Sequence, residues 1–396
     1  MFSSGILYAW SLIASRLTAP IAEGGYGWTV SQAGLPYVLA AIVCSTSMLV
    51  GGRIQDKIGP RWVLTVGALM MGLGILFAGL VGNSLVGIIL SFSIFSAIGQ
   101  GLNYSSVTAP ALKWFHSSKK GLVSGLILGA YGLSAVFYAP LTSFLLNKYG
   151  IAGSFIILGI GTVIVLTIIA QLIRNPPDGY IPPTPSKIKQ QANNYAPPVN
   201  FAWKEMLVTK RFRLMFIIFL MTASVGLMFI GNMAKVAQTQ VGISDTAILT
   251  AIVSFLALMN ALGRVIGGRT SDKIGRVNTL FLVLGLQMLN MAAFAFYQNL
   301  TALLLGIVLV GFCFGTLLAT MPALCADMYG LNNFGLNYAI LFLAWGLAGI
   351  FAPIIANLLY DATGSFNIAY RICAVMMGLM LIVNFVLKKD IDAQQV

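Results

Sequence analysis

The chain has 396 residues, of which 58% are hydrophobic and only 8% are charged. A soluble domain carries about 25% charged residues, so this composition excludes a soluble globular protein and is typical of an integral membrane protein. The formal net charge of +13 would suit a nucleic-acid-binding protein, but 18 of the 23 Lys and Arg residues fall in segments predicted to be cytoplasmic. That distribution follows the positive-inside rule, so the charge reports membrane topology and argues against a nucleic acid partner.

Apolar segments near or above 18 residues recur along the chain, and each is long enough to cross a hydrocarbon core of about 30 Å. They predict an all-α membrane protein. Its twelve transmembrane helices are expected at residues 2–19, 33–52, 61–82, 85–112, 120–147, 152–173, 212–238, 247–268, 277–297, 300–326, 334–359 and 366–387.

The first of these helices is short at its beginning. Seven residues separate Met1 from Tyr8, which is about 10 Å of helix, whereas mid-membrane lies about 15 Å from the surface. We therefore expect that the natural start lies upstream of Met1 and that this helix is truncated. A short, tilted or bilayer-thinning helix is the structural alternative.

Residues 175–211, between the sixth and seventh helices, hold seven prolines and several Lys and Arg. This composition predicts a cytoplasmic linker and not a core. It divides the chain into an N-terminal six-helix bundle (1–174), the linker (175–211) and a C-terminal six-helix bundle (212–396), with both termini on the cytoplasmic side.

The two predicted bundles repeat one another. The matching positions are Asp56 and Asp272 at an offset of 216, Pro110 and Pro322 at 212, and Tyr131 and Trp345 at 214. Six helices separate the members of each pair, so both copies run in the same direction. In transporters built from such parallel repeats, the substrate site lies between the halves near mid-membrane.

A glycine- and charge-containing loop follows the second helix and returns after the eighth. The residues concerned are Gly52, Asp56, Lys57 and Arg61 in the first copy, and Gly268, Asp272, Lys273 and Arg276 in the second. The glycine lets two helix ends approach, and the Asp can accept hydrogen bonds from a neighbouring helix N-terminus. The pattern resembles the loop motif of the major facilitator superfamily, and that resemblance implies the twelve-helix fold. We expect the loops to act as conformational latches and not to bind substrate.

Four segments resemble one branch of that superfamily more closely, the oxalate/formate antiporter family with its bacterial monocarboxylate carriers. They are Gly5–Ser11 around Tyr8, Asn103-Tyr104, Gly129–Gly132 around Tyr131, and Arg264 eight residues before Asp272. The resemblance implies that Tyr8, Tyr104, Tyr131 and Arg264 surround a small carboxylate. Oxalate-exchanging members carry a lysine on the eleventh helix where this chain has Trp345, a departure that favours a singly charged substrate.

Arg264 stands out without any comparison, because it lies in the apolar run 247–268. A cation at membrane depth costs about 2.5–3.5 kcal/mol by insertion scales, and it is usually kept for an anionic visitor. The alternative is that Arg264 reaches toward the inner surface. Asn260 lies one turn earlier on the same face and is expected to orient the guanidinium or donate to a substrate oxygen. A plain hydrogen bond between helices is its alternative.

The three tyrosines have an ordinary interpretation as part of an interfacial aromatic belt. Tyr131 and its repeat mate Trp345 are predicted near the middle of long helices, too deep for a belt. A buried phenol needs a hydrogen-bond partner, and an anion beside Arg264 would supply one. The depth of Tyr8 depends on where the first helix begins.

All ten Asp and Glu residues map to loops or predicted helix ends. Proton-coupled carriers commonly place a titratable carboxylate at membrane depth. Coupling through Asp245, Asp327 or the substrate itself, and anion exchange without protons, all stay open. The four cysteines have no metal-ligand spacing and are interpreted as packing residues, and His116 as a solvated loop residue.

These observations predict a secondary transporter that carries small monocarboxylates of the lactate, pyruvate or formate type by alternating access. The alternatives are an oxalate–formate type exchanger, a carrier of another substrate such as a sugar or drug, and a membrane anion sensor without transport. We expect no enzymatic chemistry, cofactor or metal. The expected partners are a carboxylate anion, a co-transported proton in the symport alternative, and the bilayer of the plasma membrane, with the protein as a monomer.

Overall fold

The computed structural model describes residues 6–114, 120–177, 180, 200–330 and 333–393, and this part of the chain contains helices and no strand. The N-terminal elements are α1 (Ile6–Thr18), η2 (Ile21–Glu23), α2 (Val30–Ile58), α3 (Pro60–Leu80), α4 (Leu85–Ile88), η3 (Ile89–Ser96), α5 (Ala97–Trp114) and α6 (Lys120–Leu172). The C-terminal elements are α7 (Trp203–Val208), α8 (Lys210–Val241), α9 (Thr246–Ile274), α10 (Arg276–Phe294), α11 (Leu300–Tyr329), α12 (Phe334–Thr363) and α13 (Asn367–Asp392).

The predicted all-α membrane fold is confirmed. Segments α4, η3 and α5 follow one another as the predicted fourth helix, and α6 is two helices that meet at Gly150, whose φ of 68° interrupts the helical backbone. Within the described residues, ten helical stretches are long and apolar enough to cross a membrane, and one of them contains both parts of α6. The described part of α1 has 13 residues. Residues 1–5, on which the expectation of an upstream start depends, lie outside the described residues.

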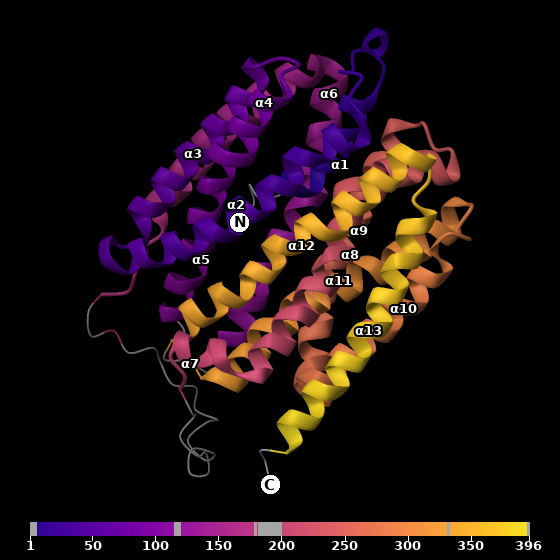
Figure 1. Cartoon of the computed structure of the whole chain (residues 1–396). Coiled ribbons are helices and arrows are strands. Elements are labelled where there is room, and N and C mark those ends of the chain that lie inside the picture. Colours follow the sequence, from indigo (N-terminus) through magenta and orange to yellow (C-terminus); the bar gives the residue numbers. More distant parts are fainter. Residues whose placement is uncertain (1–5, 115–119, 178–179, 181–199, 331–332, 394–396) are drawn as a thin grey trace.

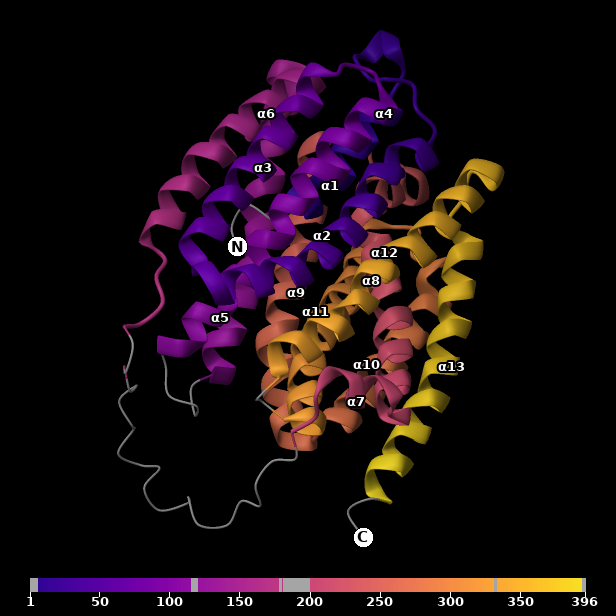
Figure 2. The same cartoon turned by 60° about the vertical axis from the view of Figure 1, so that its left-hand side comes forward.

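The helices form two groups side by side. In Figure 1 the group α1–α6 (indigo to magenta) lies on one side and α8–α13 (pink to yellow) on the other, and the turned view of Figure 2 keeps α6 and α13 on opposite sides. We call these groups the N-half and the C-half. Helix α7 and the C-terminus lie at the same end of both views. We call this the linker end and the other the opposite end.

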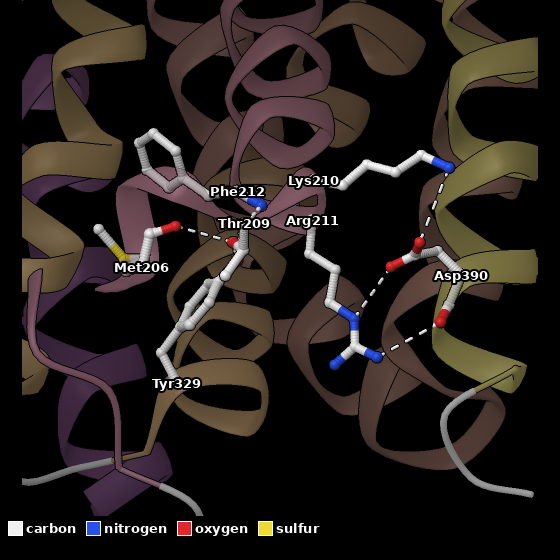
Figure 3. Close-up of polar contacts among 7 residues, drawn as sticks. All are labelled: Met206, Thr209, Lys210, Arg211, Phe212, Tyr329 and Asp390. Carbon is white, nitrogen blue, oxygen red and sulfur yellow. Dashed lines mark hydrogen bonds and ion pairs between the residues drawn. The ribbon is translucent and has the colours of Figure 1, made fainter. Parts of the chain in front are cut away.

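The predicted linker is not entirely irregular, because its last part folds onto the C-half as α7. The carboxylate of Glu205 accepts a hydrogen bond from Ala202 N at 2.7 Å, which satisfies a free N–H at the helix start. The side chain of Met206, on α7, is fully buried. The hydroxyl of Thr209 then caps α8 by accepting from Phe212 N at 3.2 Å (Figure 3). A short apolar helix inside a proline-rich segment was missed because its composition is averaged with that of its surroundings.

An ionic cluster fastens the start of α8 to the end of α13 (Figure 3). Arg211 donates to Asp390 twice, from Nε to the carboxylate at 3.2 Å and from Nη2 to the backbone carbonyl at 3.3 Å. Lys210 Nζ lies 3.7 Å from the same carboxylate. The first and last helices of the C-half are therefore held together at the linker end.

Small residues let the helices of this bundle approach closely, as is common in membranes. A Cβ added to Gly346 on α12 would collide with Ser45 on α2, so these helices from different halves touch along their backbones. A Cβ added to Gly315 on α11 would collide with the backbone carbonyl of Asn260 on α9. The second contact fixes the place of α9 inside the C-half, and the first joins the halves.

Hydrogen bonds join the two halves at the opposite end. The carboxylate of Asp361, near the end of α12, accepts from the backbone N–H groups of Val30 and Ser31 at the start of α2, both at 3.0 Å. Ser15 on α1 donates to Gln238 on α8 at 2.9 Å. We call these contacts the opposite seam. Among the described residues, side-chain hydrogen bonds between the halves lie at this end or at middle depth, so the halves are joined away from the linker.

Candidate anion-binding site between the two halves

Arg264 lies at the boundary between the halves and only 3% of it is exposed. Its Nε donates to Asn260 Oδ1 at 3.0 Å, within α9, and its Nη1 donates to the carbonyl of Leu128 on α6 at 2.6 Å. Its guanidinium carbon lies 5.6 Å from the centre of the Tyr131 ring, close enough for a cation–π interaction. Three neutral groups among the described residues therefore contact this buried cation: a backbone carbonyl, an amide oxygen and a ring face.

Tyr131 extends the site from α6 toward α5. Its ring is 5% exposed, and its hydroxyl accepts a hydrogen bond from Gln100 Nε2 at 3.3 Å. The ring also meets Tyr104 edge to face with centroids 5.5 Å apart. Tyr131 therefore connects the cation of the C-half to two polar side chains of α5.

A row of aromatic rings crosses from the N-half to the C-half. Tyr104 stacks on Phe342 at 5.5 Å, and Phe342 stacks on Trp345 at 5.1 Å. Tyr338 contacts Phe342 from the preceding turn of α12 at 5.7 Å. These rings form an apolar wall beside Tyr131 with polar atoms at their edges. Through the contact of Tyr104 with Tyr131, this row is connected to the ring that faces Arg264.

The indole of Trp345 carries an unusual donor. The residue is 7% exposed, and its buried Nε1 has no hydrogen-bond acceptor among the described residues. A buried N–H left without an acceptor costs roughly 1–3 kcal/mol. A ligand oxygen placed beside the indole would remove that cost.

The structure therefore brings together five of the six residues predicted to bind substrate: Arg264, Asn260, Tyr131, Tyr104 and Trp345. The side chain of Tyr8 on α1 lies outside the described residues. Whether the five bind a ligand stays a prediction, but their arrangement is one that can hold an anion.

Sequence reasoning missed Gln100, Phe342 and Tyr338. Residues 338, 342 and 345 on α12 share one helical face, and Gln100 lies one turn before Tyr104 on α5. Those spacings were visible in the sequence and could have added all three residues once Trp345 and Tyr104 were chosen.

The second latch copy forms an ionic cluster inside the C-half. Arg276 donates to Asp272 and to Ser271, both at 2.5 Å, and its Nε donates to Asp327 on α11 at 3.2 Å. Lys273 is exposed. A Cβ added to Gly268 would meet only one described atom, at 3.6 Å, so this glycine is not a point of close helix approach here.

The first latch copy is likewise bound within its own half. Arg61 Nε donates to Gln171 Oε1 on α6 at 2.6 Å, and Gln171 donates onward to Thr65 at 3.0 Å. A Cβ added to Gly52 would meet no described atom within 4 Å. The side chains of Asp56 and Lys57 lie outside the described residues. In the part of the loops that is described, neither arginine reaches across to the other half, so the latch role stays a prediction.

The carboxylates, the cysteines and the single histidine were the other polar groups for which the sequence supported a prediction. The described Asp and Glu residues lie in loops or the end turns of helices, with Asp245 capping α9 through Ala247 N and Ile248 N. The four cysteines are buried and unpaired by disulfides, in agreement with packing roles. His116 and Asp178 lie outside the described residues.

Comparisons with known proteins identify the family of this chain. The family model described as Major Facilitator Superfamily matches residues 1–300 and 288–395. The chain is 28% identical over 374 residues to the oxalate:formate antiporter of Oxalobacter formigenes, covering 94% of this chain and 85% of that protein. It is 26% identical to an uncharacterized MFS-type transporter of Escherichia coli, covering 88% and 83% of the two chains. It is 24% identical to monocarboxylate transporter 13 of Rattus norvegicus, covering 83% and 73%.

Proposed function

Because the chain belongs to the major facilitator superfamily, a family of membrane transporters, we propose that it carries small monocarboxylates of the lactate, pyruvate or formate type by alternating access. The observation that carries this proposal is the guanidinium of Arg264, which is buried between the halves and donates to the amide oxygen of Asn260 and the carbonyl of Leu128. A charge kept at membrane depth is usually functional. The oxalate:formate and monocarboxylate carriers among its relatives support an organic anion as the ligand.

The carboxylate would take its main charge-assisted hydrogen bonds from Arg264, whose planar fork matches two oxygens. Hydroxyl groups of Tyr131 and Tyr104 and the indole N–H of Trp345 would donate to the same ligand. Hydrogen bonds to charged groups contribute about 1.5–3 kcal/mol each. Asn260 would hold the guanidinium in place through its bond to Nε.

Two features favour one carboxylate over two. Trp345 stands where the resemblance implies a lysine in oxalate-exchanging carriers, and the stacked rings of Phe342 and Tyr104 fill the adjacent space. A second carboxylate would therefore meet aromatic surface and lose hydration without gaining a cation. This contrast separates the proposal from oxalate–formate exchange.

We further propose that the linker and both termini face the cytoplasm and that the membrane is the plasma membrane. The Lys and Arg residues of the linker end support this orientation through the positive-inside rule. In that orientation the opposite seam closes the outer side. The latch role of the two loops belongs to the same proposal, with their arginines free to change partners when the linker end closes.

The test is uptake of radiolabelled lactate, formate and oxalate into proteoliposomes, with and without a pH gradient. We expect saturable uptake of lactate or formate, with oxalate a poor substrate. Faster exchange of oxalate than of either monocarboxylate would replace the proposal with the exchanger. Binding without any uptake or exchange would replace it with the anion sensor. The dependence on the pH gradient separates proton symport from anion exchange.

A further inference from the structure

A polar cavity lies at the opposite end, away from Arg264. It has a volume of about 370 Å³ and is bounded by α1 and α6 from the N-half and by α8 and α9 from the C-half. Its polar lining comes from Ser15, Ser143, Asn147, Gln238 and Thr246. Because a water molecule occupies about 30 Å³ of the liquid, this space can hold a small hydrated anion.

Arg16 is the cation of this cavity. It is partly buried, and its Nε is buried without a hydrogen-bond partner among the described residues. Glu23 also lines the cavity but is exposed at the rim, and no ion pair links it to Arg16 in the described structure. The positive group therefore lies deeper than the negative one, and Arg16 is part of the lining that a ligand in the cavity would meet.

The same two helices connect this cavity to the central site. On α6, Ser143 follows Tyr131 by twelve residues, about 18 Å along the helix; on α9, Leu249 precedes Arg264 by fifteen residues, about 22 Å. Buried Leu249 lines the inner part of the cavity. The cavity is therefore placed along the boundary between the halves, on the line that a ligand would follow once the opposite seam opens.

We propose that this cavity, which we call the Arg16 cavity, is a second anion-binding site, one that receives a small monovalent carboxylate before it reaches Arg264. The inference rests on the proposed function for its ligand class. The guanidinium of Arg16 supplies the charge, and the hydroxyl of Ser143 and the amide of Asn147 supply further donors. The rim carboxylate of Glu23 weakens binding of an anion, so the two charges act in opposite directions.

Equilibrium binding of radiolabelled lactate and formate to the purified, detergent-solubilised chain tests this site without depending on transport. We compare the wild type with Arg16→Gln, Arg264→Ala and the double variant, after a thermal melt has shown that each is folded. We expect two sites in the wild type, one in each single variant and, over the same range of ligand concentrations, none in the double variant. Absence of binding by Arg264→Ala would overturn the Arg16 cavity as a site and leave the proposed function standing. If instead Arg16→Gln loses all binding while Arg264→Ala binds as well as the wild type, the central site is refuted.

A second measurement compares removal of the positive charge of the cavity with removal of its negative charge, which should change the affinity in opposite directions. We expect Arg16→Gln to weaken the Arg264→Ala background's remaining site at least tenfold and Glu23→Gln to strengthen it about threefold at low salt, with both changes shrinking at high ionic strength. Glu23→Gln is the matched control, since it removes one charge from the same cavity. The same sign of change in both variants would overturn the proposal. Chloride is then added at the same concentration as the carboxylate. If chloride competes equally well, the cavity is a general anion site and the proposed selectivity for carboxylates is overturned.

Discussion

Removal of the Asp361 carboxylate is expected to loosen the opposite seam. In the structure this one side chain accepts from two backbone N–H groups at the start of α2, those of Val30 and Ser31, both at 3.0 Å. It therefore caps a helix of the other half. Loss of a helix N-cap costs about 0.5–2 kcal/mol. Because these bonds exist only while the seam is closed, the whole loss acts on the ratio of closed to open molecules, which should fall about 2- to 30-fold in Asp361→Ala.

The assay is a distance distribution between spin labels attached at residues 86 and 296. Val86 and Phe296 lie near turns of different halves at the opposite end, and they are 65% and 79% exposed, so labels there disturb little packing. The natural cysteines are buried and should react slowly. We expect Asp361→Ala to increase the longer-distance population, and Asp361→Asn, which keeps one acceptor oxygen, to give an intermediate result.

Asp245→Ala is the matched control for this experiment. Asp245 is also a carboxylate cap at the opposite end, but it accepts from Ala247 N and Ile248 N of its own helix, α9. Its loss should weaken one half without separating the two. An unchanged distribution in Asp361→Ala, or an equal shift in Asp245→Ala, would refute the reasoning.

Four further predictions concern the central site and the second latch. Arg264→Lys keeps the charge but loses the planar guanidinium fork, so transport measured by proteoliposome uptake should fall at least tenfold. The control Arg269→Lys, at an exposed position of the same helix, should transport normally in the same assay. Trp345→Lys should raise the dicarboxylate-to-monocarboxylate uptake ratio, and an unchanged ratio in a well-folded variant would place residue 345 away from substrate. Tyr131→Phe should raise the KM for monocarboxylate without changing folded yield. Arg276→Gln should lower unfolding stability by about 1 kcal/mol, seen in thermal melts, because the cluster is only partly buried.

The helical fold was predictable because the membrane imposes both length and composition on each span. The expected helix at residues 300–326, for example, is found at Leu300–Tyr329. Errors arise at the ends, where polar turns extend the helix beyond its apolar part, as α9 does by continuing to Ile274. Helix α7 was missed because its residues are few and lie in a polar, proline-rich segment. The burial of Met206, which holds it against the C-half, depends on tertiary contacts that the local sequence does not show.

The candidate site was partly predictable because it is made of residue types that membranes tolerate poorly. Arg264 identified the site by its charge, and Asn260 followed from helical spacing. Phe342 gave no such signal, since a phenylalanine in an apolar helix is ordinary and only its stacking between Tyr104 and Trp345 makes it notable. The bond from Arg264 to Leu128 was also beyond reach, because a backbone carbonyl has no identity in a sequence.

The π-helix η3 (Ile89–Ser96) has a consequence for how the two repeats can be altered. In the first half, 25 positions separate Leu85 from Pro110, whereas 22 separate Leu300 from Pro322 in the second. A π-helical turn holds more residues than an α-helical one, so the extra residues are accommodated within the span and not in a loop. Because a π-helical turn absorbs its extra residue locally, deleting one residue from η3 would return a turn to α-helix and leave the direction of the later side chains nearly unchanged. Gln100 and Tyr104 would then stay beside Tyr131, whereas the same deletion at residues 97–99, in the regular α-helix that follows, would turn both side chains by about 100° and away from it.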